Sequence, residues 1–269
     1  MGEKMKNAPV YFTIAQVRHN PVLQLGYYAP DIQERMRKAG YPDFKKGTAM
    51  AFSFSLRPHI DNGSMQQNPA VEPVERLMFF SADSTRGFVV EQNALSFHTT
   101  DYDTFETFAD EFMRGVSIVH ECVTLALTVR IGLRYLDAVV PPNEEEGLPS
   151  YLAPGVLGIS NRLPADVLVS HSIAETHIQT SECAVLARTI IQAGQLGFPM
   201  DLQPIGVKIA DHFQKIDGVH AIIDTDASIE RQQAFDMGSI REQLEKLRRG
   251  VGLAFDATVM PLAVVAWNN

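Results

Sequence analysis

Apolar residues alternate with polar or small residues in several short runs of the first half of the chain. This period of two is typical of strands that bury one face. The predicted strands are residues 10–17, 50–56, 76–81, 87–91, 94–99 and 130–137. Turn-forming pairs, Asp83-Ser84 and Gln92-Asn93, join the three runs between 76 and 99. These three runs therefore predict an antiparallel meander.

Two longer segments repeat their apolar residues every three or four positions, as amphipathic helices do. The first covers residues 105–127, and Asp103 or Thr104 can cap its start. The second runs from about Met237 to Thr258 and ends before Pro261. A shorter amphipathic helix is predicted over residues 32–38, after Pro30-Asp31 and before Gly40. We therefore expect helices as well as strands in one α+β fold.

The second half of the chain has its own strand candidates before its long helix. They are residues 167–180, 184–192 and 222–225, with a less regular run at 207–213. Residues 59–75, with Asn, Gln and Pro, suit an exposed connection. Glycine and proline are frequent between residues 143 and 164, which predicts a linker. The expected organisation is an α+β half over 1–142, a linker over 143–164 and an α+β half over 165–269, packed as one unit.

The two halves share an order of elements: a β region, a polar break, a long helix and a short apolar segment. Arg114-Gly115-Val116 in the first long helix recurs as Arg249-Gly250-Val251 in the second. An internal duplication with a pseudo-two-fold axis is therefore a hypothesis. Its simplest form places both long helices on one face of a shared antiparallel sheet.

One segment carries a family resemblance. Residues Arg130 to Asp137, which follow an amphipathic helix, resemble the core motif of a large bacterial family that is distributed sporadically among species. The acidic strand 222–226 and Trp267 are similar to features of the same family. The chain departs from it at Asp137, where many members carry asparagine, which puts any role of that amide in doubt. The resemblance implies an architecture, no particular chemistry, and an accessory role such as defence or a mobile-element function.

Composition and charge narrow the class of protein. Hydrophobic residues make up 45% and charged residues 20%, which is typical of a globular chain. Cys122 and Cys183 lie far apart and fit neither a disulfide framework nor a zinc motif, which indicates reduced thiols. No run reaches the roughly 20 apolar residues of a membrane helix. We therefore expect a cytoplasmic protein without a membrane segment, and a net charge of −9 disfavours nucleic acid as a partner.

A candidate metal site combines Asp224, Asp226, Glu175 and His177. Residues two apart on a strand face the same side, so each pair could supply ligands to a divalent cation. The competing interpretation is that Asp224 and Asp226 stand at a strand end, where aspartates solvate turns and cap helices. The sequence thus leaves open whether a cation binds, and no other cofactor is expected.

A candidate binding site combines Arg130, Arg134 and Tyr135. The two arginines lie four residues apart on a predicted strand and could hold an anion or the carboxylates of a partner. The competing interpretation pairs them with acids on neighbouring strands. His120 and Cys122, two residues apart around Glu121 on a helix, do not have the geometry of a catalytic pair, since adjacent helical residues point about 100° apart.

Three functions follow in order of preference. The nucleophile elbow, the phosphate-binding loop and the dinucleotide-binding turn are all missing from the sequence. The preferred hypothesis is a non-catalytic binding or assembly protein that forms a homo-oligomer or joins a protein partner in a bacterial system. The first alternative is a divalent-metal hydrolase of phosphoesters that uses the four residues of the metal site. The second is a nucleic-acid-binding protein.

Overall fold

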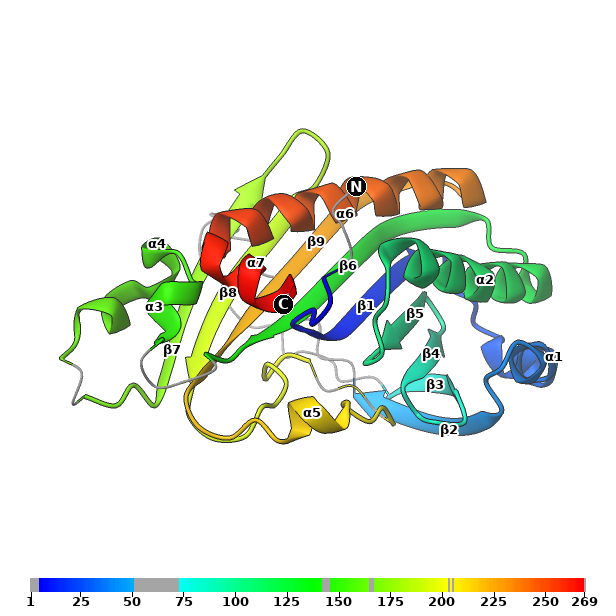
Figure 1. Ribbon diagram of the computed structural model, residues 1–269. Coiled ribbons are helices and arrows are strands. Elements are labelled where there is room, and N and C mark those ends of the chain that lie inside the picture. The colour runs from blue at the N-terminus through cyan, green and yellow to red at the C-terminus, as the bar shows by residue number, and fades with distance from the viewer. Residues whose placement is uncertain are drawn as a thin grey trace, which may run out of the picture.

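The chain folds around one antiparallel sheet of nine strands in the order β2-β3-β4-β5-β1-β6-β9-β8-β7. The computed structural model describes residues 5–50, 73–141, 146–164, 167–202, 204 and 206–268. In Figure 1 the strands fan across the molecule, with the long helices α2 and α6 above them and the short helix α5 below. The mixed α/β class and the antiparallel sheet predicted from the sequence are confirmed.

The strands fall into two groups along the chain. The first group is β1 Val10–His19, β2 Asp43–Met50, β3 Pro73–Phe80, β4 Arg86–Glu91, β5 Ala94–Thr99 and β6 Leu127–Val139. The second group is β7 His171–Gln179, β8 Ala184–Gln192 and β9 His220–Ala234. β6 pairs with β9 along most of its length, from Leu127 opposite Ala234 to Val139 opposite Ala221. The two predicted halves therefore share one continuous sheet.

The helices differ in length and in what they cover. They are α1 Leu25–Lys38, α2 Phe105–Val123, α3 Leu148–Tyr151, α4 Pro154–Leu157, α5 Asp211–Gln214, α6 Met237–Thr258 and α7 Pro261–Asn268, with a 3-10 turn, η1, at Gly158–Arg162. Thr104 caps α2 by accepting a hydrogen bond from the Thr107 amide, 3.2 Å away. Asp236 caps α6 in the same way by accepting from the Ser239 amide. No helix of the described residues is both long and apolar enough to cross a membrane.

The alternation along each strand divides the sheet into two faces. Leu133 and Tyr135 of β6 point to the helix face, where they join the main core with residues of α1, α2 and α6. Arg134 and Leu136 point to the opposite face. The described residues between 194 and 216, which include α5, cover part of that opposite face. They are held there by hydrogen bonds from Tyr11 Oη to the Gly197 carbonyl (2.8 Å) and from Thr100 Oγ1 to the Lys208 carbonyl (2.6 Å).

Several predicted boundaries differ from the structure. The strand predicted at 207–213 is wrong, because this segment is a loop that leads into α5. The helix predicted from residue 32 begins at Leu25 instead, and Pro30 lies inside it. Most of the strand predicted at 50–56 lies outside the described residues, as does the connection predicted at 59–75 up to residue 72. The segment 143–164, predicted to be irregular, contains α3, α4 and η1 in its described part.

Candidate functional site

Two arginines and two aspartates form an ionic network on the sheet face opposite the long helices. Arg134 donates to Asp224 from Nε (2.7 Å) and from Nη2 (2.8 Å). Arg188 Nη2 lies 2.7 Å from Asp224 Oδ2. Asp201, from the segment that covers this face, pairs with Arg134 at 3.1 Å and with Arg188 at 2.9 Å. Each carboxylate therefore contacts both guanidinium groups.

Strand register places these groups together. β9 lies between β6 and β8, so its residues face both neighbours. Arg188 of β8 is directly opposite Asp224, and Arg134 of β6 is opposite Asp226, one diagonal step away from Asp224. The Asp224 side chain is 0% exposed. A carboxylate removed from water needs charged or hydrogen-bonding partners, and the two arginines supply them.

Two arginines and two aspartates make the network neutral in sum. Burial alone would lower the pKa of Arg134, but hydrogen bonds and attraction from Asp224 and Asp201 raise that pKa above its ordinary value. Burial alone would raise the pKa of Asp201, but Arg134 and Arg188 lower that pKa below its ordinary value. Two positive and two negative groups therefore hold each other in place, and the network acts as a structural clamp between the sheet and the covering segment.

A looser ionic group continues along the same face. Arg130 of β6 lies 3.9 Å from Asp226 and 3.9 Å from Glu230, both on β9. Its guanidinium lies across Gly132, where an added Cβ would stand 2.6 Å from Arg130 Nη1. The glycine in this strand thus leaves room for the arginine to lie flat on the sheet. The Asp226 side chain is 30% exposed, so this group borders solvent.

The four residues of the predicted metal site do not converge. Asp224 and Asp226 share one face of β9, as expected, but arginines neutralise them. Glu175 and His177 lie on β7, with β8 in between, and His177 Nε2 is 2.8 Å from Glu175 Oε1. Across the three strands Arg188 stands in register between Asp224 and Glu175. Within the described part of the chain no three His, Cys, Asp or Glu side chains lie close enough to hold a metal ion.

The predicted binding residues separate onto two faces. Arg130 and Arg134 share the face that carries the ionic groups, and both pair with aspartates, which is the competing interpretation of the sequence. Tyr135 points to the helix face and is buried. Its hydroxyl lies 3.1 Å from that of Tyr102, and the Arg248 guanidinium stands over its ring at 6.0 Å. These three residues are therefore not parts of one site.

Asp137 is the unusual group of the interior. It follows Tyr135 on the same face of β6, is 3% exposed, and has no hydrogen bond or ion pair from its carboxyl within the described residues. Burial raises the pKa of Asp137 to about 7, the positive charge of Arg248 lowers it, and the negative charge of Asp224 raises it. A buried acid of this kind weakens the fold when it ionises.

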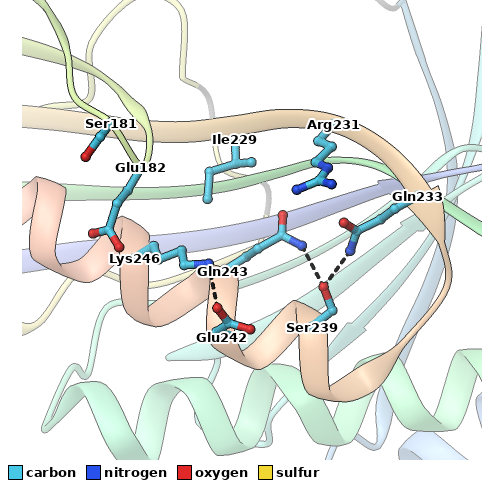
Figure 2. Close-up of a pocket in the computed structure, with 9 residues that line it drawn as sticks. All are labelled: Ser181, Glu182, Ile229, Arg231, Gln233, Ser239, Glu242, Gln243 and Lys246. Atoms are coloured by element: carbon cyan, nitrogen blue, oxygen red, sulfur yellow. Dashed lines mark hydrogen bonds and ion pairs between the residues drawn. The ribbon is translucent and has the colours of Figure 1, made fainter.

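A polar cavity of about 410 Å³ lies between the start of α6 and the ends of β7, β8 and β9 (Figure 2). It is lined by Ser181, Glu182, Ile229, Arg231, Gln233, Ser239, Glu242, Gln243 and Lys246. Figure 2 shows the Gln233 and Gln243 side chains converging on the Ser239 hydroxyl, to which both donate, and Lys246 pairing with Glu242. Five of the lining side chains are therefore already paired with one another.

The edge strand β7 carries main-chain hydrogen-bonding groups that point away from β8. The Thr180 amide donates to the Cys183 carbonyl (2.9 Å), and the Ala193 amide donates to the Ser170 carbonyl (3.2 Å). Both contacts place even-numbered residues in hydrogen-bonded pairs with β8. In an antiparallel ladder this role alternates along the strand, so the odd-numbered residues point their N–H and C=O groups away from β8. These residues are His171, Ile173, Glu175, His177 and Gln179.

Exposed apolar side chains gather near the start of β7. Ile159 is 76% exposed, Leu168 is 70% exposed and Ile173 is 52% exposed. Ile159 and Leu168 line a shallow hollow of about 250 Å³ beside η1, together with the first residues of β7. We call Ile159, Leu163, Leu168 and Ile173 the η1 patch. Neighbouring exposed apolar residues of this kind are typical of protein-binding surfaces.

Comparison with known proteins identified no relative of this chain. No family model, no curated protein and no solved structure matches the chain. The functional argument therefore rests on the geometry of the ionic network, the cavity and the β7 edge.

Proposed function

We propose that this chain is a binding or assembly protein that takes up a protein strand at the β7 edge of its sheet. The observation that carries the proposal is the row of outward-pointing N–H and C=O groups on the odd-numbered residues of β7. Such a row is a template for main-chain hydrogen bonds with a further strand. The bacterial accessory role implied by the family resemblance is the setting we expect for this assembly.

The two edges of the sheet differ in how they are protected. Natural proteins guard edge strands with lysines, prolines, bulges or short length. β2, at one edge, carries the adjacent lysines Lys45 and Lys46. β7, at the other edge, is nine residues long, pairs with β8 without a bulge and contains neither lysine nor proline. This asymmetry supports β7 as the edge that accepts a partner.

The surroundings of β7 supply contacts beyond the main chain. Every second residue of an added strand would face the same side as Ile173 and the exposed side chains of Glu175 and His177. The η1 patch extends this surface past the start of the strand with apolar side chains. Main-chain hydrogen bonds would give affinity, and these side chains would give selectivity.

A proline substitution tests the proposal without disturbing the sheet. Glu175→Pro removes an outward-pointing N–H and leaves the hydrogen bonds to β8 in place, because Glu175 does not donate to β8. Glu175→Ala removes only the side chain and is the matched control. We expect Glu175→Pro to abolish association, measured by sedimentation velocity over a range of concentrations, and Glu175→Ala to weaken it without abolishing it. Equal association of both variants would reject β7 as the binding edge.

The hydrolase alternative has less support. Its metal ligands would include Asp224, whose carboxylate is fully buried and already contacts two arginines. A cation would have to displace those arginines or bind beside them, against their positive charge. The nucleic-acid alternative finds no support in Arg130, Arg134 or Arg188, because each of them pairs with acids.

The internal duplication belongs to the same proposal. In each half a three-stranded meander is followed by a long helix: β3-β4-β5 with α2, and β7-β8-β9 with α6. An added Cβ on Gly115 of α2 would stand 2.1 Å from Phe88 of β4. An added Cβ on Gly250 of α6 would stand 2.6 Å from Cys183, directly before β8. In both halves the glycine of the repeated Arg-Gly-Val string thus packs against the middle strand of its meander, which supports a common origin.

A further inference from the structure

We infer that the strand taken up at the β7 edge is β7 of a second copy of this chain, paired antiparallel about Thr176. The inference rests on the proposed function and names its partner. It predicts a symmetric dimer in which two nine-stranded sheets join into one, with the long helices of both copies on the same side.

Backbone geometry restricts the registers that such a pair can adopt. Only the odd-numbered residues of β7 point their N–H and C=O groups outward. Two copies can exchange hydrogen bonds only if odd-numbered residues face odd-numbered residues. In a symmetric antiparallel pair this condition is met when the two-fold axis runs midway between the two copies of one residue, so that this residue faces its own copy. Registers centred between two residues are excluded.

Side chains select among the remaining registers. A two-fold axis at Glu175 would place two carboxylates opposite each other, and an axis at His177 would place two imidazoles opposite each other. An axis at Ala174 would place Ile173 opposite Glu175. An axis at Thr176 places Glu175 of each copy opposite His177 of the other, twice in the dimer. Within one copy His177 Nε2 lies 2.8 Å from Glu175 Oε1, so this register brings two such pairs together around the axis.

The remaining pairs of this register bring no like charges together. On the helix face Ala174 lies opposite Ile178 of the second copy, so a small side chain meets a large one. Thr176 lies opposite Thr176 of the second copy, and Ile173 lies opposite Gln179 of the second copy. The stretch 173–179 is centred on Thr176, and η1 lies beside the preceding residues Ser170, His171 and Ser172. The part of β7 that η1 leaves uncovered is therefore centred on Thr176, the residue at which this register places the axis.

A single cysteine tests the register directly. Thr176 does not exchange outward hydrogen bonds, so its pair across the axis is of the close kind, with Cα atoms about 4.5 Å apart, within disulfide range. We expect Thr176→Cys to form a disulfide-linked dimer under mild oxidation. Ala174→Cys, which would face Ile178, is the matched control and should remain unlinked. The unsubstituted protein, with Cys122 and Cys183 only, gives the background.

Charge exchange tests the contact that selects the register. Glu175→Lys should place a lysine opposite a histidine, and His177→Glu should place two acids opposite each other. We expect each variant to weaken dimerisation by roughly ten- to thirtyfold, because the change occurs twice in the dimer. The double variant Glu175→Lys/His177→Glu restores opposite charges and should regain most of the affinity.

The outcomes separate this inference from the proposed function. If the chain dimerises, Thr176→Cys crosslinks and the double variant regains affinity, both the register about Thr176 and the β7 binding edge are supported. Dimerisation that Glu175→Pro abolishes, without the crosslink, overturns the register about Thr176 and retains the β7 edge. A chain that stays monomeric at 200 µM, about two hundred times a Kd of 1 µM, overturns the second copy as partner. Dimerisation that Glu175→Pro leaves intact overturns both.

Discussion

Arg134 and Asp224 form a doubly hydrogen-bonded pair, at 2.7 and 2.8 Å, across the junction between the two groups of strands. They are 90 residues apart in the sequence. Because Asp224 has no contact with water, its charge depends on this pair and on Arg188. The ionic network therefore joins the first half of the chain to the second, and its loss should weaken the whole fold.

The first prediction concerns this carboxylate. Asp224→Asn leaves two buried guanidinium groups without a full counter-charge, and we expect the free energy of unfolding to fall by about 3 kcal/mol. Urea denaturation followed by circular dichroism measures the change. Asp226→Asn, on the same strand face but 30% exposed, is the control and should cost less than about 1 kcal/mol. Unchanged stability of Asp224→Asn, together with loss of a bound divalent metal by elemental analysis, would favour the hydrolase alternative instead.

The second prediction concerns Asp137 and pH. Its folded-state pKa, about 7, is above the unfolded value of 3.8. Between these two values the folded chain holds the proton that the unfolded chain has lost, so stability falls as pH rises through this window and levels off above it. At pH 8 the cost amounts to roughly 4 kcal/mol. We expect Asp137→Asn to be more stable than the parent protein at pH 8 and similar to it at pH 4.

Thermal unfolding at several pH values measures this difference. Asp256→Asn, at an exposed position on α6, is the control and should follow the parent protein at every pH. A constant difference between Asp137→Asn and the parent protein from pH 4 to pH 8 would contradict the assignment of a buried ionisable acid.

The third prediction concerns the two helix glycines. Ala at Gly115 would press on the Phe88 ring, and Ala at Gly250 would press on Cys183 and on Val185, 3.1 Å away. We expect each substitution to reduce stability by about 1–3 kcal/mol, through overpacking between helix and sheet. Gly252→Ala, whose Cβ would meet only the flexible Arg248 side chain at 3.4 Å, is the matched control.

The control should gain up to about 1 kcal/mol, because alanine is a better helix former than glycine. Guanidinium denaturation gives all three values. If Gly115→Ala and Gly250→Ala were as stable as Gly252→Ala, the close packing of both helices on the middle strands would be disproved, and with it the structural support for a duplication.

The fourth prediction concerns hydrogen exchange along β7. At low protein concentration the amides of Ile173, Glu175 and His177 should exchange quickly, while those of Ala174, Thr176 and Ile178 should be protected by β8. At high concentration the odd-numbered amides should become protected as the edge is occupied. NMR-detected exchange resolves each residue. A uniform rate along the strand, at any concentration, would contradict the alternation from which the binding edge is derived.

Local patterns predicted much of the fold. The alternation at 76–99 predicted the meander β3-β4-β5. The three- to four-residue spacing after Thr104 and from Met237 predicted α2 and α6, because period and capping are properties of neighbouring residues. The helix α1 extends further than predicted since Leu25 belongs to the apolar stripe of Ile32 and Met36. The run at 207–213 misled the prediction because its apolar residues pack on the sheet without being a strand: Val207 and Ile209 from a loop and Phe213 from α5.

The functional surfaces depend on long-range pairing, which a single sequence does not display. Asp224 and Arg134 were both singled out, but for different sites, since nothing local indicates that β6 and β9 are neighbours. Arg188 and Asp201 were missed altogether. An arginine in the middle of the run 184–192 was the available signal, because a charge inside a buried strand requires a partner. The open edge at β7 follows from strand order, and strand order is a property of the whole chain.

The placement of β1 has a consequence for how the molecule is made. β1 lies in the middle of the sheet, between β5 and β6, which come about 75 and 110 residues later in the chain. During synthesis the segment that forms β1 leaves the ribosome before β5 and β6 have been made. Its main-chain groups therefore have no strand to pair with during that time. The nascent polypeptide is then most vulnerable to aggregation, and a chaperone that shields Tyr11 and Phe12 at that moment would raise the yield of native protein.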